Sequence, residues 1–240
     1  GFNQVELYLS DNQGFRLALD DMNVKVKVGD EETTYDLTPA LGDGYNEYDK
    51  TTKKPTKTTD GSGKYLTQSE MTEIIKYANG KGIDIVPCIN VPGHMGAILE
   101  EFTSFRYSGS KSSIDLENDK AKQFALEITR KYAKYFKEQG VKYYNIGADE
   151  YANDINAGMG FARLYSQGKM DIFYDFLNKA AEVVESEGLI PRAFNDGIYY
   201  ANDDSWATLS DENGEIKYPY LTQIQVCYWS SGWGNSYDLA

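Results

Sequence analysis

Apolar runs of strand-like length recur along the chain, and amphipathic helical patterns lie between most of them. The runs cover residues 3–10, 82–90, 140–148, 189–196 and 222–230. Most of these runs are continuously apolar rather than alternating, which is typical of parallel strands that helices cover on both faces. The repeated order of strand, loop and helix therefore predicts an α/β fold with a parallel sheet.

Helix boundaries are marked by local signals. The first predicted helix, residues 67–82, opens with Thr67 and Glu70 at the spacing of a capping box. Amphipathic patterns over residues 117–140 and 168–188 predict two longer helices, and a glycine closes each of them. The length of 240 residues, 41% of them hydrophobic, suits one domain over residues 1–240.

Two polar stretches interrupt the alternation. Residues 20–66 are rich in Thr, Lys, Asp and Gly and are predicted to be an insertion with a hairpin over residues 24–37. Residues 201–219 form a second polar loop. Part of the first stretch resembles a calcium loop, but its glutamate, Glu70, comes one residue too late for the bidentate position. We therefore expect no metal site.

Charge and composition limit the partners of the chain. A formal charge of -13 argues against binding to nucleic acid or to an anionic membrane surface. We expect no membrane span, because no run reaches the roughly 20 apolar residues that one requires. The chain enters a strand almost at once without a signal peptide, which suggests a piece of a longer protein. Cys88 and Cys227 each follow or end an apolar run and are predicted to be buried thiols rather than a disulfide.

Polar or aromatic side chains follow all five predicted strands. In parallel α/β folds ligands bind beyond the carboxyl ends of the strands, so these side chains are the candidates for a site. They are Asp11, Asn12, Asn90, His94, Asp149, Glu150, Tyr151, Asn195, Asp196, Tyr228, Trp229 and Trp233. His94 is the only histidine in the chain. A lone histidine is often structural, but this one stands in a Pro-Gly-His turn after a buried strand.

Asp149 and Glu150 are adjacent in the segment "YYNIGADEYAND". Neighbouring carboxylates repel each other, and burial increases the cost. In different environments such a pair can hold different protonation states and cleave a glycosidic bond. Alternatively, Asp149 caps a helix and Glu150 lies in its first turn, where the helix dipole favours an acid. The spacing alone leaves both interpretations open.

The serial order of motifs resembles glycoside hydrolase family 20, the β-N-acetylhexosaminidases. The motifs are "FNQVELYLSDNQGFR", "GIDIVPCINVPGHMGA", "YYNIGADEYAND", "AFNDGIYY" and "VCYWSSGW". The later ones are similar above all to streptococcal surface hexosaminidases. The resemblance covers nearly the whole chain, and the combination of Pro-Gly-His with Gly-x-Asp-Glu is its most specific part.

The resemblance implies a (β/α)8 TIM-type barrel and retaining, substrate-assisted hydrolysis of terminal β-linked N-acetylhexosamine from glycans, without a cofactor. Glu150 matches the general acid, and Asp149 matches the residue that orients the acetamido group of the substrate. His94 matches a histidine that adjusts the proton affinity of the acid. Asp11 matches an acidic residue of the same network. These roles give the adjacent acids two tasks on one sugar.

Further residues are assigned to the sugar pocket and its support. Trp229 and Trp233 are candidates for aromatic walls, and the other substrate-binding candidates are Tyr228, Asn195, Asp196 and Tyr151. Asn90 stands where many family members have an acid, so it is expected to bond His94 without supplying charge.

The resemblance also implies that parts of the barrel are missing. The family's first strand would precede Gly1 and a later Trp-Tyr-x-Asp strand would follow Ala240. We therefore expect an incomplete barrel, with weak or no activity in the isolated chain. The rival function is a carbohydrate-binding, catalytically impaired member of the same fold. The resemblance implies that the protein is extracellular or lies on the surface of a bacterium. The sequence leaves the oligomeric state open.

Overall fold

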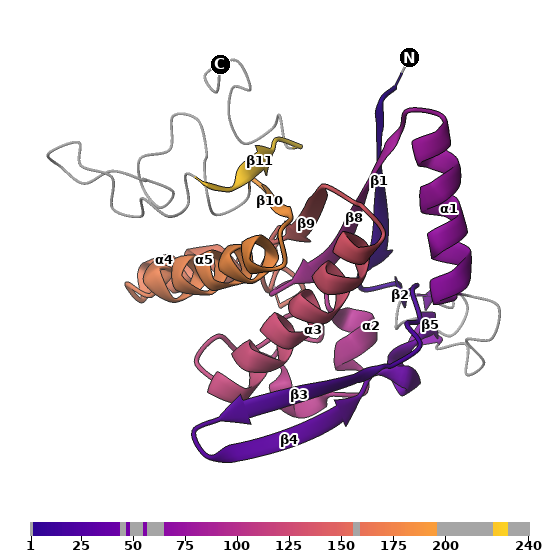
Figure 1. Cartoon of the computed structure of the whole chain (residues 1–240). Helices are drawn as coiled ribbons and strands as arrows, with labels where there is room; N and C mark the ends of the chain where they lie inside the picture. The colour runs from indigo at the N-terminus through magenta and orange to yellow at the C-terminus, as the bar shows by residue number, and fades with distance from the viewer. Residues whose placement is uncertain are drawn as a thin grey trace, which may run out of the picture.

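The structure is a computed structural model that describes residues 2–43, 47–48, 55–56, 65–155, 159–195 and 223–229. Its centre is a seven-stranded sheet with the order β11-β10-β9-β8-β1-β2-β5 (Figure 1). Five neighbouring strands are parallel: β1 (Gln4–Ser10), β8 (Asp84–Val91), β9 (Tyr143–Gly147), β10 (Ile190–Phe194) and β11 (Gln225–Cys227). These are the five strands that the sequence predicts. Two short antiparallel strands, β2 (Gly14–Phe15) and β5 (Gly42–Asp43), extend the sheet beyond β1.

The three predicted helices are confirmed as α1 (Gln68–Gly80), α3 (Asp119–Glu138) and α5 (Met170–Ser186). They connect successive parallel strands, as the βαβ pattern requires. The capping box at the start of α1 is present, because the Glu70 amide donates to Thr67 Oγ1 and the Thr67 amide donates to the Glu70 carboxylate. Four short helices were not predicted from the sequence: α2 (Gly96–Leu99), α4 (Met159–Ser166) and the 3-10 helices Thr38–Ala40 and Thr103–Phe105.

The predicted hairpin in the polar insertion is confirmed as β3 (Asn23–Val28) and β4 (Glu31–Asp36). A further strand pair, β6 (Glu47–Tyr48) and β7 (Pro55–Thr56), lies in the same stretch. Figure 1 shows β3 and β4 running beside α3. Val24 and Val26 of β3 are buried in the same core as α3, so the first half of the insertion is part of the packed domain.

The apolar core lies between the sheet and its helices. Phe124, Tyr132 and Phe136 on α3 are fully buried, and the Tyr132 hydroxyl donates to the carbonyl of Leu17 at 2.7 Å. Both thiols are free, as expected. Cys88 is buried as predicted, whereas Cys227, predicted to be buried, is only half-buried.

The sheet is open within the described residues: it runs from β11 to β5, and these two ends do not pair. This agrees with the expected incomplete barrel. No helix in the described part of the chain is long and apolar enough to span a membrane. The polar loop at residues 201–219 lies outside the described residues.

Candidate active site

The loops after β8 and β9 bring a histidine and two carboxylates together, and the loop after β1 reaches the same histidine through Asn12. His94 Nε2 lies 3.2 Å from Glu150 Oε2 and 3.4 Å from Asp149 Oδ2. His94 was expected within hydrogen-bond reach of Asn90, Asp11 or Glu150, and of these three the structure places Glu150 there. Because the three strands are parallel neighbours, their carboxyl ends place these loops at one edge of the sheet.

Two glycines allow the loops to approach this closely. A Cβ added to Gly93 would lie 2.8 Å from the carbonyl oxygen of Asp149. A Cβ added to Gly147 would overlap the amide oxygen of Asn90, and Gly147 also has a φ of 82°. Gly93 and Gly147 are therefore needed because the end of β8 with its loop packs closely against the end of β9 with its loop.

The acid pair lies in a strained loop and not at a helix start. Ala148, Glu150 and Ala152 have φ values of 65°, 47° and 54°, and His94 has a φ of 50°. Positive φ is uncommon for residues other than glycine and costs about 1–3 kcal/mol where it occurs. The next helix, α4, begins only at Met159. The interpretation of Asp149 as a helix cap is therefore wrong.

The two carboxylates have different surroundings. The Asp149 side chain is 12% exposed and the Glu150 side chain is 33% exposed. The hydroxyl of Tyr8, at the end of β1, lies 3.4 Å from Asp149 Oδ1, and the side-chain amide of Asn90 bonds the same hydroxyl. Asp149 is thus enclosed by hydrogen-bonding groups, whereas Glu150 faces solvent more openly.

Burial and the nearby carboxylate shift the pKa values of Tyr8 and His94, the two titratable partners of Asp149. Burial, followed by the charge of Asp149, raises the pKa of Tyr8 above its usual range, so the phenol stays protonated and donates to the acid. Burial alone would lower the pKa of His94. The hydrogen bond to Asp149 and the charges of Asp149, Glu150 and Asp11 outweigh burial and raise it.

The second ring nitrogen of His94 has a partner that was not predicted from the sequence. His94 Nδ1 lies 3.0 Å from Asn12 Nδ2, whereas Asn90 bonds Tyr8. The expected bond between Asn90 and His94 is therefore replaced by one from Asn12. Asp11 accepts the backbone amides of Gln13 and Gly14 and influences His94 only through its charge.

The residues predicted for the sugar pocket are placed only in part. Asn195 is buried at the end of β10, and its side-chain oxygen accepts the backbone amide of Trp229 at 3.2 Å. The Trp229 side chain is among the exposed apolar groups, and Tyr228 beside it is half-buried. Trp233 and Asp196 lie outside the described residues.

Tyr151 was predicted to bind substrate, and the structure contradicts this prediction. Its side chain is fully buried, and its hydroxyl donates to the carbonyl of Ile114 at 3.0 Å. The ring packs among Tyr107, Phe161 and Phe173. Tyr151 is therefore a core residue and does not line a sugar site.

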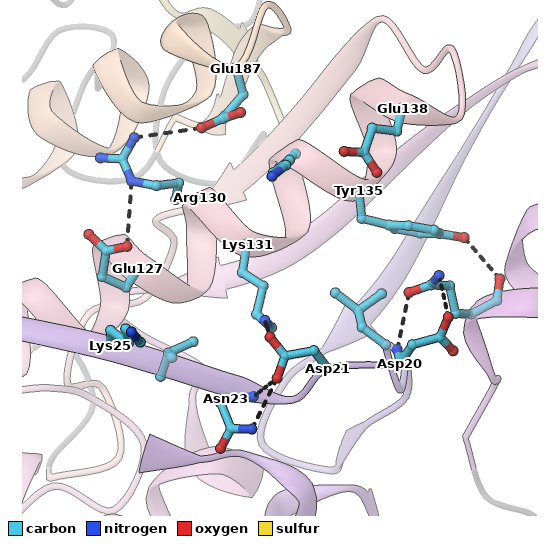
Figure 2. A pocket seen from close by; sticks show the side chains of 14 residues that line it. Asp20, Asp21, Asn23, Lys25, Glu127, Arg130, Lys131, Tyr135, Glu138 and Glu187 are labelled. Atoms are coloured by element: carbon cyan, nitrogen blue, oxygen red, sulfur yellow. Dashed lines mark hydrogen bonds and ion pairs between the residues drawn. The ribbon is translucent and has the colours of Figure 1, made fainter. Parts of the chain in front are cut away.

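A separate groove of about 600 Å³ lies between the start of β3 and α3 (Figure 2). Lys131 bonds Asp21 at 2.8 Å, and Arg130 lies 3.5 Å from Glu127 and 3.7 Å from Glu187. These opposite charges pair with one another, and the lining shares no residue with the cluster around His94. The groove therefore belongs to the packing of the insertion on α3.

Comparison with known proteins agrees with the geometry. Residues 1–216 match the sequence profile described as "Glycosyl hydrolase family 20, catalytic domain". The fold is similar to a solved structure of the pneumococcal virulence factor StrH, described in terms of N-glycan recognition and hydrolysis. That match has a TM-score of 0.74 and 32% identity and covers 97% of this chain and 52% of that chain.

Two curated relatives show the same similarity at lower coverage. A lacto-N-biosidase of Bifidobacterium bifidum is 29% identical over 191 residues, covering 69% of this chain and 17% of the relative. A β-hexosaminidase of Vibrio vulnificus is 23% identical over 238 residues, covering 82% of this chain and 27% of the relative. The chain thus spans about half of the pneumococcal structure and about a quarter or less of these two proteins.

Proposed function

The chain belongs to glycosyl hydrolase family 20, a family of TIM-barrel glycosidases, and on that premise we propose that it removes terminal β-linked N-acetylhexosamine from glycans. The observation that carries this proposal is the contact of one imidazole nitrogen, His94 Nε2, with both Asp149 and Glu150. Two acids in unlike surroundings fit a reaction in which one group moves a proton and the other holds part of the substrate.

In the proposed reaction the substrate supplies its own nucleophile. The oxygen of the 2-acetamido group attacks the anomeric carbon while the bond to the leaving oxygen breaks. Glu150, the more exposed acid, donates its proton to that leaving oxygen. In the second step water attacks the anomeric carbon, Glu150 takes a proton from the water, and the acetamido group is released. Two displacements leave the configuration of the sugar unchanged.

Asp149 is proposed to orient the acetamido group and to balance the positive charge that develops on it. Its enclosed position supports this role, because Tyr8 and His94 hold the carboxylate from two sides. Trp229 and Tyr228, at the end of β11, are proposed as walls of the sugar pocket, together with Trp233 and Asp196.

The test is the effect of Glu150→Gln on the hydrolysis of N-acetylglucosaminides. It is carried out in a form of the protein whose unaltered version shows measurable turnover. We expect turnover to fall by about 10²–10⁴, the range typical of a general acid. Substrates with strongly activated leaving groups need little protonation and should lose less. Glu73→Gln, the same change on the exposed face of α1, serves as the matched control and should leave turnover unchanged.

Equal losses on both substrate types would contradict the role of Glu150. The rival function, a carbohydrate-binding protein of the same fold without catalysis, predicts a different result. Such a protein would bind N-acetylglucosamine measurably but would not hydrolyse N-acetylglucosaminides in any form of the protein. The presence of both acids and the histidine around one point supports the enzyme instead.

We propose in addition that the protein acts outside a bacterial cell or on its surface. The support is its similarity to bacterial proteins, among them the pneumococcal and bifidobacterial relatives. Protease treatment of intact cells, followed by detection of the protein, tests this location.

A further inference from the structure

Asn12 connects the loop after β1 with the Pro-Gly-His loop through both ends of its side-chain amide. The backbone amide of Gly96 donates to Asn12 Oδ1 at 3.1 Å, and Asn12 Nδ2 lies 3.0 Å from His94 Nδ1. A Cβ added to Gly96 would lie 2.8 Å from Asn12 Oδ1, so the glycine allows this close contact.

The orientation of the Asn12 amide is fixed by chemistry. Oxygen and nitrogen of an asparagine amide are usually assigned from their hydrogen bonds. A backbone N–H can only donate, so the atom that faces Gly96 must be the amide oxygen. The atom that faces His94 Nδ1 is then the amide nitrogen, which can only donate. His94 Nδ1 must therefore accept, and the proton of the neutral ring must lie on Nε2.

We propose that Asn12 is a positioning residue that holds the neutral imidazole of His94 in the tautomer with its proton on Nε2, directed at Asp149 and Glu150. The geometry around the ring agrees, since Nε2 faces two acceptors and Nδ1 faces a donor. An isolated imidazole has no such constraint, because either nitrogen can carry the proton.

The same contact opposes the charging of the ring. A protonated imidazole carries N–H groups on both nitrogens, so Nδ1–H would point at the N–H groups of Asn12. The groups that favour the charge are Asp149 and Glu150 after β9 and Asp11 after β1. We therefore expect the Asn12 contact to open as the ring becomes charged.

The consequence for catalysis rests on the proposed function, but the tautomer itself does not. A neutral His94 donates Nε2–H to the acids. Glu150, and not His94, then carries the proton that is transferred in the reaction. A carboxylate at position 12 would instead accept from Nδ1–H and stabilise the charged ring.

The single histidine makes the proposal directly measurable. The 240-residue chain, labelled with 15N-histidine, gives one pair of ring nitrogen signals in a long-range 1H–15N spectrum. At the alkaline end of the titration we expect Nδ1 to show the shift of an unprotonated nitrogen and Nε2 that of a protonated one. In Asn12→Asp the titration midpoint should move to higher pH, and the proton of the neutral ring should move toward Nδ1.

Asn79→Asp is the matched control, because it adds the same charge on the exposed end of α1 and should leave both readings unchanged. A neutral ring of the unaltered chain that carries its proton on Nδ1 would overturn the proposal, even if Asn12→Asp failed to fold. An unmoved midpoint in a folded Asn12→Asp chain would also overturn it. The expected spectra, together with an unchanged turnover of Glu150→Gln in a form of the protein that hydrolyses N-acetylglucosaminides, would count against the proposed function alone.

Discussion

His94 connects the chemistry of the site with the stability of the fold. Its ring is held from one side by Asn12 and from the other by Asp149 and Glu150. Because the neighbouring acids raise its pKa, the folded chain binds a proton at His94 more tightly than the unfolded chain does. That difference contributes stability that is fully present below about pH 6.5, the unperturbed value, and is lost as pH rises through the folded pKa.

We expect His94→Gln to be more destabilising, relative to the unaltered chain, at pH 6 than at pH 9. Since the chain contains no other histidine, the variant removes every imidazole titration. Urea unfolding of both proteins at a series of pH values measures the difference in unfolding free energy. A difference that stays constant from pH 6 to pH 9 would show that His94 contributes only packing.

The residues of the site could be predicted only in part from the sequence. Asp149, Glu150 and His94 were identified from their motifs, and the structure places them together. Tyr151 follows the acid pair directly, but the left-handed backbone at Glu150 and Ala152 turns its side chain into the core. Sequence adjacency cannot reveal such a reversal.

Tyr8 was not predicted as a site residue, and Asn12 was a candidate whose contact with His94 was not predicted. Each reaches the site from the first strand or its loop, far along the chain from the side chain that it bonds. Their roles depend on loop geometry and on the glycines that allow close contact, not on a local pattern. For Tyr8 a weak signal exists, since it stands two residues before Ser10 in a strand that ends at the site.

At the scale of elements, long periodic segments were predicted well and short ones were not. The capping box and the amphipathic repeat define α1, α3 and α5 because many residues contribute to each pattern. The missed α2 has only four residues, too few for any periodicity to appear. The polar insertion was predicted as an insertion with a hairpin. The alternation of valine and lysine along β3 indicates which face of the hairpin is buried, because the valines point to the core and the lysines to solvent.

Burial of the β3–β4 hairpin against α3 predicts how substitutions on β3 change the stability of the fold. Val26 on β3 is 2% exposed and lies in the core with α3, so Val26→Ala should reduce the unfolding free energy by about 2 kcal/mol. The neighbouring Lys27 points to the opposite, exposed face, and Lys27→Ala is the matched control with an expected change below about 0.5 kcal/mol. Chemical denaturation of both variants measures these values. Equal small losses would indicate that the hairpin is a separate surface loop.

At the scale of the whole molecule, the described sheet is open, whereas the family fold is a closed barrel. The acids and the histidine lie after β8 and β9, inside the parallel part of the sheet, so their cluster forms without closure. The proposed sugar-pocket walls lie instead after β10 and β11, toward one end of the sheet. The cluster of His94, Asp149 and Glu150 therefore depends on the neighbouring strands β8 and β9 and not on the ends of the described sheet.

The open sheet also predicts how the isolated chain behaves in solution. Between Gln4 and Tyr8, β1 pairs with β8 on one edge, and among the described strands none pairs with its other edge. Val5 on this strand is 39% exposed, and an unpaired apolar edge is a template for pairing with another chain. We therefore expect the 240-residue chain to associate as its concentration rises, measured by sedimentation velocity. Val5→Lys should weaken that association, because a charged side chain on an edge strand disfavours pairing.

Tyr77→Lys provides the matched control for this prediction. Tyr77 is a large apolar side chain with 71% exposure, but it lies on α1 and not on a sheet edge. If the unpaired edge drives association, only the change at Val5 reduces it. If general surface hydrophobicity drives it, the more exposed Tyr77 has the larger effect. An unaltered chain that stays monomeric over the whole concentration range would contradict the prediction, because it would mean that the edge of β1 is protected.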